Sequence, residues 1–365
     1  MQKCEESAHK FFISQGTVFK ILFMGRGGSK IMNKQIMLSQ GGGGEETTSL
    51  IKGLFFKYFE NDILLKMEDA AVLNLNSKKI AFTSDSFTVS PLFFNGGNIG
   101  KLAIAGTVND VAMMGAKPLY LTCSFMIEEG FLYDDLEKIV KSMSEELKVS
   151  GALIVAGDTK VVPKGSVDGL FINTTGIGEI VKEGISAHNL SANDSIIVTN
   201  EVGNHGACIL AKREDIELDT ELKSDCATLW PMVKALLEED IAVKSFRDAT
   251  RGGLSAVLNE WAETSEVCIE VDEDKIPVAP EVNGICEMLG FEPYEFANEG
   301  TMVICVDEKD TLRALEILKS FDKTSKSSHI GKVTDRYKNR VVLNTPWGSS
   351  RYLEPPKGEL LPRIC

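Results

Sequence analysis

The chain has 365 residues, of which 43% are hydrophobic, and it carries a formal net charge of -14 at pH 7. This length and hydrophobic content allow two domains, each with its own core. The negative charge argues against a nucleic-acid-binding surface and against attraction to anionic lipid. No apolar run reaches the roughly 18 residues that a membrane span requires, and the first thirty residues lack a secretory signal pattern. We therefore expect a soluble, cytoplasmic protein.

A run of four glycines precedes the first predicted helix. Residues 1–31 match no periodic pattern, and we treat them as a leader that is a candidate for a dispensable extension. The apolar spacing of residues 48–59, shortly after Gly41 to Gly44, predicts a helix. Exposed backbone N–H groups at a helix start can wrap an anion, but a glycine run can equally form a flexible arm. The glycines alone leave both interpretations open.

Two short apolar segments, residues 69–75 and 78–87, come next along the chain. Their composition and length are typical of β-strands. Each segment has an aspartate at one end, Asp69 in the first and Asp85 in the second. We therefore expect both carboxylates at strand boundaries.

Helical spacing of apolar residues then appears twice. Residues 100–116 combine small and apolar side chains at this spacing, with Asn109 and Asp110 as interruptions. Residues 133–151 carry a clearer apolar stripe, which predicts an amphipathic helix. The stripe consists of Leu136, Ile139, Val140, Met143 and Leu147.

The caps of this second helix and two further strands complete the first half. Asp134 is the expected N-cap, with Glu137 three residues later, and Gly151 is expected to end the helix. The next apolar segment predicts a strand that ends at Gly157 to Lys160. A strand over residues 169–181 is expected to close this half.

Strands and helices continue to alternate in the second half. His205 lies in a glycine-flanked turn, which gives no reason to prefer a catalytic role over a structural one. Asp248, Thr250, Arg251 and two glycines lead into a helix, as in an anion site at a helix N-terminus. The predicted strands are residues 194–200 and 301–307, and the predicted helices are residues 207–214, 253–263 and 308–321.

Aspartates recur at the ends of the predicted elements. Carboxylates of this kind suit Mg²⁺, which is usually shared with substrate phosphates, and phosphoryl transfer needs such a metal to neutralise charge. Each aspartate taken singly is better explained as an ordinary turn residue. The sequence has no P-loop and no dinucleotide-binding glycine motif between a strand and a helix. The aspartates concerned are Asp69, Asp85, Asp110 and Asp158.

The eight cysteines form no CxxC pair and no Cys/His spacing of a zinc site, so most are expected to be reduced structural thiols. Cys123 and Cys305 lie in strand-like apolar runs and are predicted to be buried. Cys365 ends the segment "LPRIC" and has no such explanation.

The ordered motifs resemble the HypE family of hydrogenase maturation factors, within the wider group of ATP-using synthetases typified by aminoimidazole ribonucleotide synthetase. The resemblance covers roughly residues 32–365, and "SPLFF" and the cysteine-terminated tail are its HypE-specific parts. The motifs that carry it are "EDAAVL", "SDSFTVSPLFF", "GGNIGKLAIAGTVNDVAMMGAKPLYL", "AGDTKVV", "GLFINTTGIG", "RDATRGGL", "ANEG" and "LPRIC".

The resemblance implies a two-domain α/β (α+β) fold of the PurM type. An N-terminal ATP-binding α/β domain, residues 32–181, would pair its sheet with that of a second copy in a homodimer. Residues 182–345 would form an α+β domain, and residues 346–365 a mobile tail that ends in the carrier cysteine.

The resemblance also implies a reaction. A carbamoyltransferase, HypF, would load a carbamoyl group on Cys365, and ATP with Mg²⁺ would drive its dehydration to a thiocyanate. The HypC–HypD complex would receive the product as a cyanide ligand for the iron of a nickel–iron hydrogenase.

By matching motifs, Lys160 and Glu299 are the expected catalytic partners of Cys365; without the resemblance both would pass for surface residues. The predicted cofactor-binding residues are Gly42, Gly43, Asp69, Asp85, Asn109, Asp110, Asp158, Asp248 and Thr250. The predicted metal ligands are Asp69, Asp85, Asp110 and Asp158.

The prolines of the tail favour an extended arm, and ten such residues span roughly 30 Å. Arg363 and Lys357 are expected to favour the thiolate of Cys365.

Glu68, Gln40, Asn204 and Ala249 depart from the family's motifs and put details of metal coordination in doubt. Two alternatives remain open: another synthetase of the superfamily, which would not need the tail, and a non-catalytic ATP-dependent scaffold, which would use it only for docking.

Overall fold

The computed structural model describes residues 34–42, 45–67, 70–216, 222–357, 361 and 363–365. The predicted leader, Gly43, Glu68 and Asp69 therefore lie outside the described residues. Within the described ranges, no helix combines the length and apolar character that crossing a bilayer requires.

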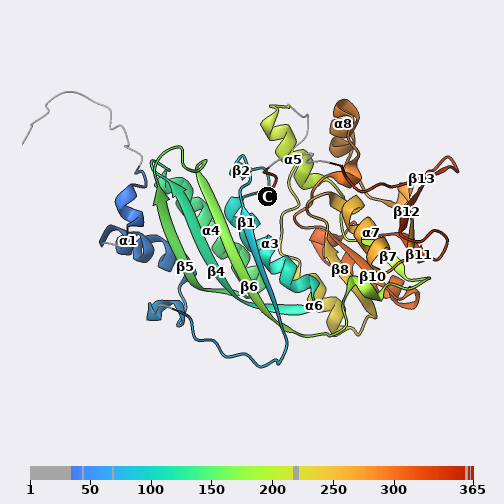
Figure 1. Ribbon diagram of the computed structural model, residues 1–365, viewed down its shortest axis with the longest axis horizontal. Coiled ribbons are helices and arrows are strands. Elements are labelled where there is room, and N and C mark those ends of the chain that lie inside the picture. The colour runs from blue at the N-terminus through green and yellow to red at the C-terminus, as the bar shows by residue number, and fades with distance from the viewer. Residues whose placement is uncertain (1–33, 43–44, 68–69, 217–221, 358–360, 362) are drawn as a thin grey trace, which may run out of the picture. The chain divides into compact units, whose positions relative to one another are not determined.

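The first half of the chain folds into a four-stranded sheet with helices on one face (Figure 1). The strand order is β1-β6-β4-β5, and only the β4–β5 pair is parallel. The amphipathic helix α4 makes the crossover between these two parallel strands, and α3 packs against β1, β6 and β4. The bounds are β1 Ile80–Phe87, α3 Ile99–Met113, β4 Ala116–Glu128, α4 Tyr133–Ser150, β5 Leu153–Val162 and β6 Leu170–Ile180.

A helical segment precedes this sheet, as predicted for residues 48–59. It consists of α1 (Glu45–Leu50), a π-helical turn (Ile51–Phe55) and α2 (Phe56–Phe59). The glycine loop before it rests directly on β5, because a Cβ added to Gly41 would lie 2.3 Å from the backbone nitrogen of Val161. Glycine is therefore required at this close approach.

Three predictions for this half are wrong. Residues 70–75, within the predicted strand 69–75, are irregular and pair with no strand. The N-cap of α4 is Leu132, which has no side-chain acceptor, and Asp134 lies in the first helical turn. Strand β5 does not end at Gly157 to Lys160 but continues to Val162, because β4 pairs with it along this whole stretch. The helix stop at Gly151, whose φ is 75°, is confirmed.

The second half contains a seven-stranded sheet in the order β13-β12-β9-β11-β7-β10-β8, flanked by five helices. The strands are β7 Ser195–Val198, β8 Val243–Asp248, β9 Cys268–Asp272, β10 Met302–Val306, β11 Ser328–Thr334, β12 Arg340–Asn344 and β13 Ser350–Tyr352. The helices are α5 Asn204–Arg213, α6 Trp230–Glu238, α7 Gly253–Thr264, α8 Pro280–Leu289 and α9 Thr311–Lys319. The predicted elements of this half are all present, and Cys123 and Cys305 are buried as expected.

The two halves share a packed boundary at helix α3, which contacts β8 and α6. Asn109 of α3 donates its amide to the carbonyl oxygen of Ala227 (3.1 Å) and accepts the N–H of Leu229 (2.7 Å). Both ends of this buried amide are therefore bonded to a segment of the second half. A short hairpin, β2 (Phe93–Phe94) with β3 (Gly97–Asn98), lies beside the same boundary.

Candidate active site

The end of the chain docks on the segment that follows β1. The N–H of Thr88 donates to the main-chain oxygen of Cys365 (2.9 Å), and the N–H of Ser90 donates to that of Arg363 (3.1 Å). Ile364 between them is buried. Figure 1 marks this end of the chain beside β2. The thiol is thus carried to the boundary of the two halves.

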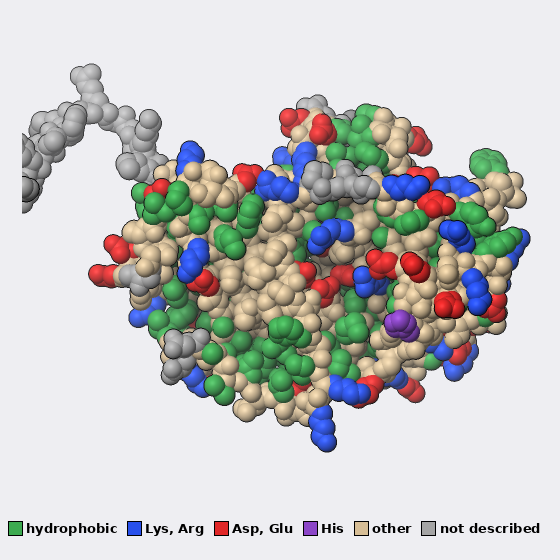
Figure 2. Space-filling model, viewed as in Figure 1, with side chains coloured by type: hydrophobic (Ala, Val, Ile, Leu, Met, Phe, Trp, Pro, Cys, Tyr) green, Lys and Arg blue, Asp and Glu red, His purple; other side chains and the backbone are tan. Residues whose placement is uncertain are grey.

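Cys365 opens onto a small cavity of about 50 Å³ that is rich in carboxyl groups. Such a volume accommodates a group of only a few atoms. In Figure 2, acidic side chains gather near the middle of the face shown, with lysine and arginine side chains beside them. The functional side chains that line the cavity are Asp85, Asp110, Asp248, Thr250, Arg251, Glu299 and Cys365.

Different elements supply these residues. Asp85 comes from β1 and Asp110 from α3, where its carboxylate accepts the hydroxyl of Thr83 (2.8 Å). Asp248 ends β8, opposite Met302 of the neighbouring β10. Glu299 lies in the loop that enters β10. Strand pairing in the two sheets and the packing of α3 thus bring together residues that are far apart in the sequence.

Glu299 is held by a neighbour that the sequence analysis missed. The carboxylate of Asp225 accepts the N–H groups of Glu299 and Gly300 (3.0 Å each) and the hydroxyl of Thr301 (2.8 Å). A Cβ on Gly300 would lie 1.9 Å from the carbonyl oxygen of Asp225, so the loop requires glycine there. The Glu299 side chain is only 3% exposed, and its Oε1 has no hydrogen-bond partner.

Burial raises the pKa of three carboxyl groups at the cavity. It is the largest cause for Glu299, whose pKa lies well above its ordinary value, with the charge of Asp248 next. Burial and the charge of Asp110 raise the pKa of Asp248 to about 7. The same two causes raise the pKa of Asp85 to about 6, while Arg251 opposes the shift. The cavity therefore holds groups that exchange protons near neutral pH.

The pKa of the Cys365 thiol is shifted in the direction opposite to the predicted one. Burial raises the pKa of Cys365 to about 12, with Glu299 adding to the rise and Arg251 opposing it. Arg363 does not act on the thiol, because its guanidinium pairs with Asp168 and donates to the carbonyl oxygen of Thr88. The expectation that Arg363 and Lys357 favour the thiolate is therefore wrong for the docked tail.

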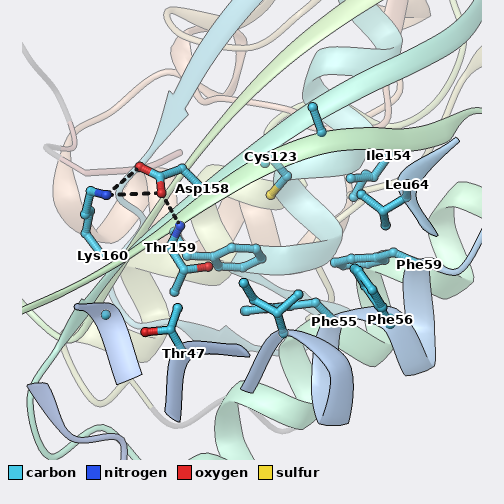
Figure 3. Close-up of a pocket in the computed structure, with 15 residues that line it drawn as sticks. Thr47, Phe55, Phe56, Phe59, Leu64, Cys123, Ile154, Asp158, Thr159 and Lys160 are labelled. Atoms are coloured by element: carbon cyan, nitrogen blue, oxygen red, sulfur yellow. Dashed lines mark hydrogen bonds and ion pairs between the residues drawn. The ribbon is translucent and has the colours of Figure 1, made fainter. Parts of the chain in front are cut away.

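Lys160 and Asp158 lie in a different place, at the mouth of a pocket on β5 (Figure 3). The ammonium group of Lys160 is 3.2 Å from the carboxylate of Asp158, and both side chains are exposed. The pocket has a volume of about 180 Å³ and an apolar floor. Its floor includes Phe55, Phe59, Leu64, Cys123 and Ile154, and Gly41 lies at its edge.

The register of the sheet gives the separation of the two regions. Lys160 of β5 is opposite Met126 of β4, which is opposite Phe171 of β6, and β1 is the next strand. Three interstrand spacings, about 14 Å, separate β5 from β1. Within one chain, Lys160 therefore does not reach Cys365, which docks just beyond β1.

The predicted cofactor residues divide between these two regions. Asp85, Asp110, Asp248 and Thr250 line the cavity at Cys365, whereas Asp158 lines the β5 pocket and Gly42 follows Gly41 at its edge. Among the described residues, no three His, Cys, Asp or Glu side chains are arranged to hold a metal ion. Binding roles for these residues, for Asn109, and for Gly43 and Asp69 outside the described ranges, stay predictions.

Three further residues belong to the site but were not among the predicted catalytic, cofactor-binding or metal-binding residues. Arg251 was named only as part of a possible anion site at the start of a helix. Asp225 acts through Glu299, and His205 contacts the tail. Neither role has a local pattern, because the partners are 74 and 159 residues away in the sequence.

Comparison with known proteins agrees with this architecture. The model of the AIR synthase related protein N-terminal domain matches residues 67–180, and that of the C-terminal domain matches residues 191–344. The chain is 45% identical over 337 residues to the carbamoyl dehydratase HypE of Escherichia coli K12, covering 90% of this chain and 99% of that protein.

Solved structures give the same relationship. A HypE in complex with ATP has a TM-score of 0.87 at 40% identity, covering 90% of this chain and 99% of that one. The HypE chain of a HypE–HypF complex has a TM-score of 0.74 at 45% identity, covering 84% and 100%. The resemblance seen in the motifs and the predicted two-domain α/β fold are confirmed, and the chain belongs to the HypE family of hydrogenase maturation proteins, the carbamoyl dehydratases.

Proposed function

We propose that this protein dehydrates a carbamoyl group carried on the sulfur of Cys365 to a thiocyanate, with ATP as the driving reagent. The observation that carries the proposal is the docking of Cys365 at a cavity lined by Glu299, whose carboxyl group is buried and lacks a partner for one oxygen. In the balanced reaction, the carbamoyl oxygen leaves with the γ-phosphoryl group as phosphate, ADP is released, and two N–H protons are lost as the C≡N bond forms.

Glu299 is the group placed to accept a proton from the carbamoyl nitrogen. Its pKa is raised by burial and by neighbouring carboxylates, which makes its ionised form a stronger base than an exposed glutamate. Arg251 lies beside the sulfur and is a source of positive charge where negative charge develops. The rigid loop held by Asp225 fixes the carboxyl group in the cavity.

The donor set suits ATP with Mg²⁺. Asp85 and Asp110 are adjacent carboxylates of the kind that hard cations prefer, and we assign them, with Asp158 of a second copy, to metal binding. The ion would neutralise the charge of the polyphosphate. The apolar β5 pocket with Lys160 and Asp158 at its mouth has the character of a site for a flat heteroaromatic ring.

We further propose that two copies pair through the open face of the first sheet. This face exposes large apolar side chains, Phe82 at 65% and Val181 at 58%, along with Ile80, Met126 and Leu153. Figure 2 shows few charged side chains over this sheet. Pairing would bring the Lys160 region of one copy toward the Cys365 cavity of the other, which a single chain does not achieve. An isologous dimer is the commonest arrangement that buries such a face.

The proposed partners follow from the carrier chemistry. A HypF carbamoyltransferase would load Cys365, and the solved complex of a related HypE with HypF supports this assignment. HypC–HypD would accept the cyanide for the iron of a nickel–iron hydrogenase. We place this reaction in the cytoplasm.

The test is intact-protein mass spectrometry after incubation with HypF, carbamoyl phosphate and ATP. The parent is expected to gain the carbamoyl mass and then lose water, with both changes mapped to Cys365. Cys365→Ser is expected to fold and bind ATP but gain no mass, since a serine hydroxyl is a much weaker nucleophile than a thiolate. Modification of another cysteine, or product from Cys365→Ser, would refute the carrier role.

A further inference from the structure

His205 of helix α5 contacts the end of the chain through one ring nitrogen and the body of the protein through the other. Its side chain is 0% exposed and lies in the first turn of α5. Nε2 is 2.8 Å from the carbonyl oxygen of Ile364, and Nδ1 is 2.8 Å from the hydroxyl of Ser224. We infer that His205 is a positioning residue that holds the tail in its docked place and thereby keeps Cys365 at the Glu299 cavity.

The hydrogen-bond network determines which nitrogen carries the proton. A carbonyl oxygen only accepts, so the bond to Ile364 requires a proton on Nε2. The hydroxyl of Ser224 already accepts the N–H of Cys226 (3.1 Å), and its own proton is free to be donated to Nδ1. The ring is therefore neutral with Nε2–H as the donor to the tail, and burial, which lowers the pKa of His205, favours the same form.

The ring is fixed by parts of the protein that do not belong to the tail. Phe94 contacts it edge to face, with ring centroids 5.3 Å apart. Ser224 is itself held, because its N–H donates to the carbonyl oxygen of Asn95 (2.9 Å). A pre-oriented donor binds the tail without first having to be ordered.

A second residue of the same helix supports the same docked position. The guanidinium of Arg213 donates to the carbonyl oxygens of Ser90 and Arg363. Helix α5 therefore holds two successive carbonyl groups of the tail, those of Arg363 and Ile364, while Thr88 holds the main-chain oxygen of Cys365. A carrier must leave this place to be loaded and return to it for dehydration, so these contacts set the ratio of docked to released tail. This consequence for catalysis rests on the proposed function.

Two substitutions separate the role of each ring nitrogen. The amide nitrogen of glutamine reaches the place of Nε2, whereas the shorter amide of asparagine reaches only that of Nδ1. His205→Gln thus keeps a donor for Ile364, and His205→Asn keeps the contact with Ser224 but leaves the buried carbonyl unpaired. Loss of one such bond is expected to shift the docked-to-released ratio about tenfold.

The test is the rate at which iodoacetamide alkylates Cys365, followed by peptide mass spectrometry on the full chain without ATP or partner proteins. His205→Asn is expected to react about tenfold faster than the parent, because the released thiol regains its ordinary pKa. His205→Gln is expected to react at nearly the parental rate. The buried thiols Cys123 and Cys305 must stay unmodified, which reports an intact fold. Equal rates in all three proteins, or equal acceleration by Asn and Gln, would overturn the inference.

A second measurement does not depend on how either variant folds. In the parent, the Nε2 proton of His205 is expected to give an exchange-protected NMR signal, which disappears when residues 362–365 are deleted. A signal that survives the deletion would overturn the assignment. In single-turnover assays, His205→Asn is expected to be loaded by HypF at least as fast as the parent, because loading needs the released tail, and to slow dehydration by less than the alkylation factor, because most tails stay docked. Because the alkylation and NMR readouts need no carbamoyl group, failure of the proposed function would leave them interpretable.

Discussion

The cavity at Cys365 and the pocket on β5 differ in how far one chain completes them. The cavity is built from both halves of the chain, its carboxyl groups are largely buried, and several have pKa values raised by burial. The β5 pocket has an apolar floor, and its two charged residues, Asp158 and Lys160, are exposed and pair with each other in solvent. Burial thus gives the first region groups suited to proton transfer, whereas the second has the character of a binding surface that awaits a partner.

The largest expected effect comes from the cavity. Glu299→Gln keeps the size of the side chain but removes the base, so the dehydration rate is expected to fall about 10²- to 10⁴-fold. Loading of Cys365 should be unchanged, since it occurs away from this cavity. The measurement is single-turnover mass spectrometry of the carbamoylated protein.

Glu295→Gln is the matched control, because Glu295 lies in the same approach to β10 but lines only the larger neighbouring cavity. It should retain dehydration within a few-fold of the parent. Equal rates for Glu299→Gln and the parent would show that the buried carboxyl group is not the base.

A smaller effect is expected from the aspartates assigned to nucleotide and metal. Asp85→Asn and Asp158→Asn each remove a negative charge that we propose faces Mg–ATP, and each is expected to weaken its binding about tenfold or more. Titration calorimetry of Mg–ATP gives the affinity. Asp240→Asn serves as the control, since Asp240 is an exposed partner of Lys182 remote from both regions. Unchanged affinity in Asp85→Asn and Asp158→Asn would remove these residues from the site.

The smallest effect concerns stability and its dependence on pH. The pKa of Asp248 is raised from 3.8 to about 7 in the folded chain, so this carboxyl group stabilises the fold fully only below its unfolded pKa. This contribution of Asp248 to the free energy of unfolding is lost as the pH rises from about 4 through 7. Asp248→Asn cannot ionise, and in the absence of metal it is expected to be more stable than the parent at pH 8 by about 1–3 kcal/mol.

Urea unfolding of the metal-free proteins at pH 5 and pH 8 measures this difference. The gain in unfolding free energy from Asp248→Asn, relative to the parent, should be larger at pH 8 than at pH 5. A variant that is less stable than the parent by the same amount at both values would contradict the raised pKa.

The sequence predicted those features of the fold that follow from the local spacing of residues, such as the apolar face and the end of a helix. The stripe of α4 and its stop at Gly151 follow from spacing alone, and the resemblance of the motifs indicated Cys365 and Glu299. Residues 70–75 were wrongly predicted as a strand, because an apolar run does not reveal whether a neighbouring strand is available to pair with it. The pKa of Cys365 was wrongly expected to fall, because nearby basic residues in the sequence did not show that the thiol docks in a buried place.

Other features depend on contacts across the fold and had no local signal. Asp225 supports Glu299 from 74 residues away, and Ile364 meets His205 across 159 residues. The separation of Lys160 from Cys365 follows from strand order, which places β5 and β1 at opposite edges of one sheet. Both residues looked like members of one site when only motifs were compared.

Mixed dimers test the central claim that a carbamoyl group on Cys365 of one chain is dehydrated with the help of Lys160 of another. Lys160→Ala and Cys365→Ser are each expected to be inactive alone. Mixing equal amounts with subunit exchange creates dimers in which Cys365 of one chain faces Lys160 of the other, and about one quarter of the parental thiocyanate should form if pairing is random. If Lys160 served the cysteine of its own chain, the mixture would stay inactive, and that result would contradict the account.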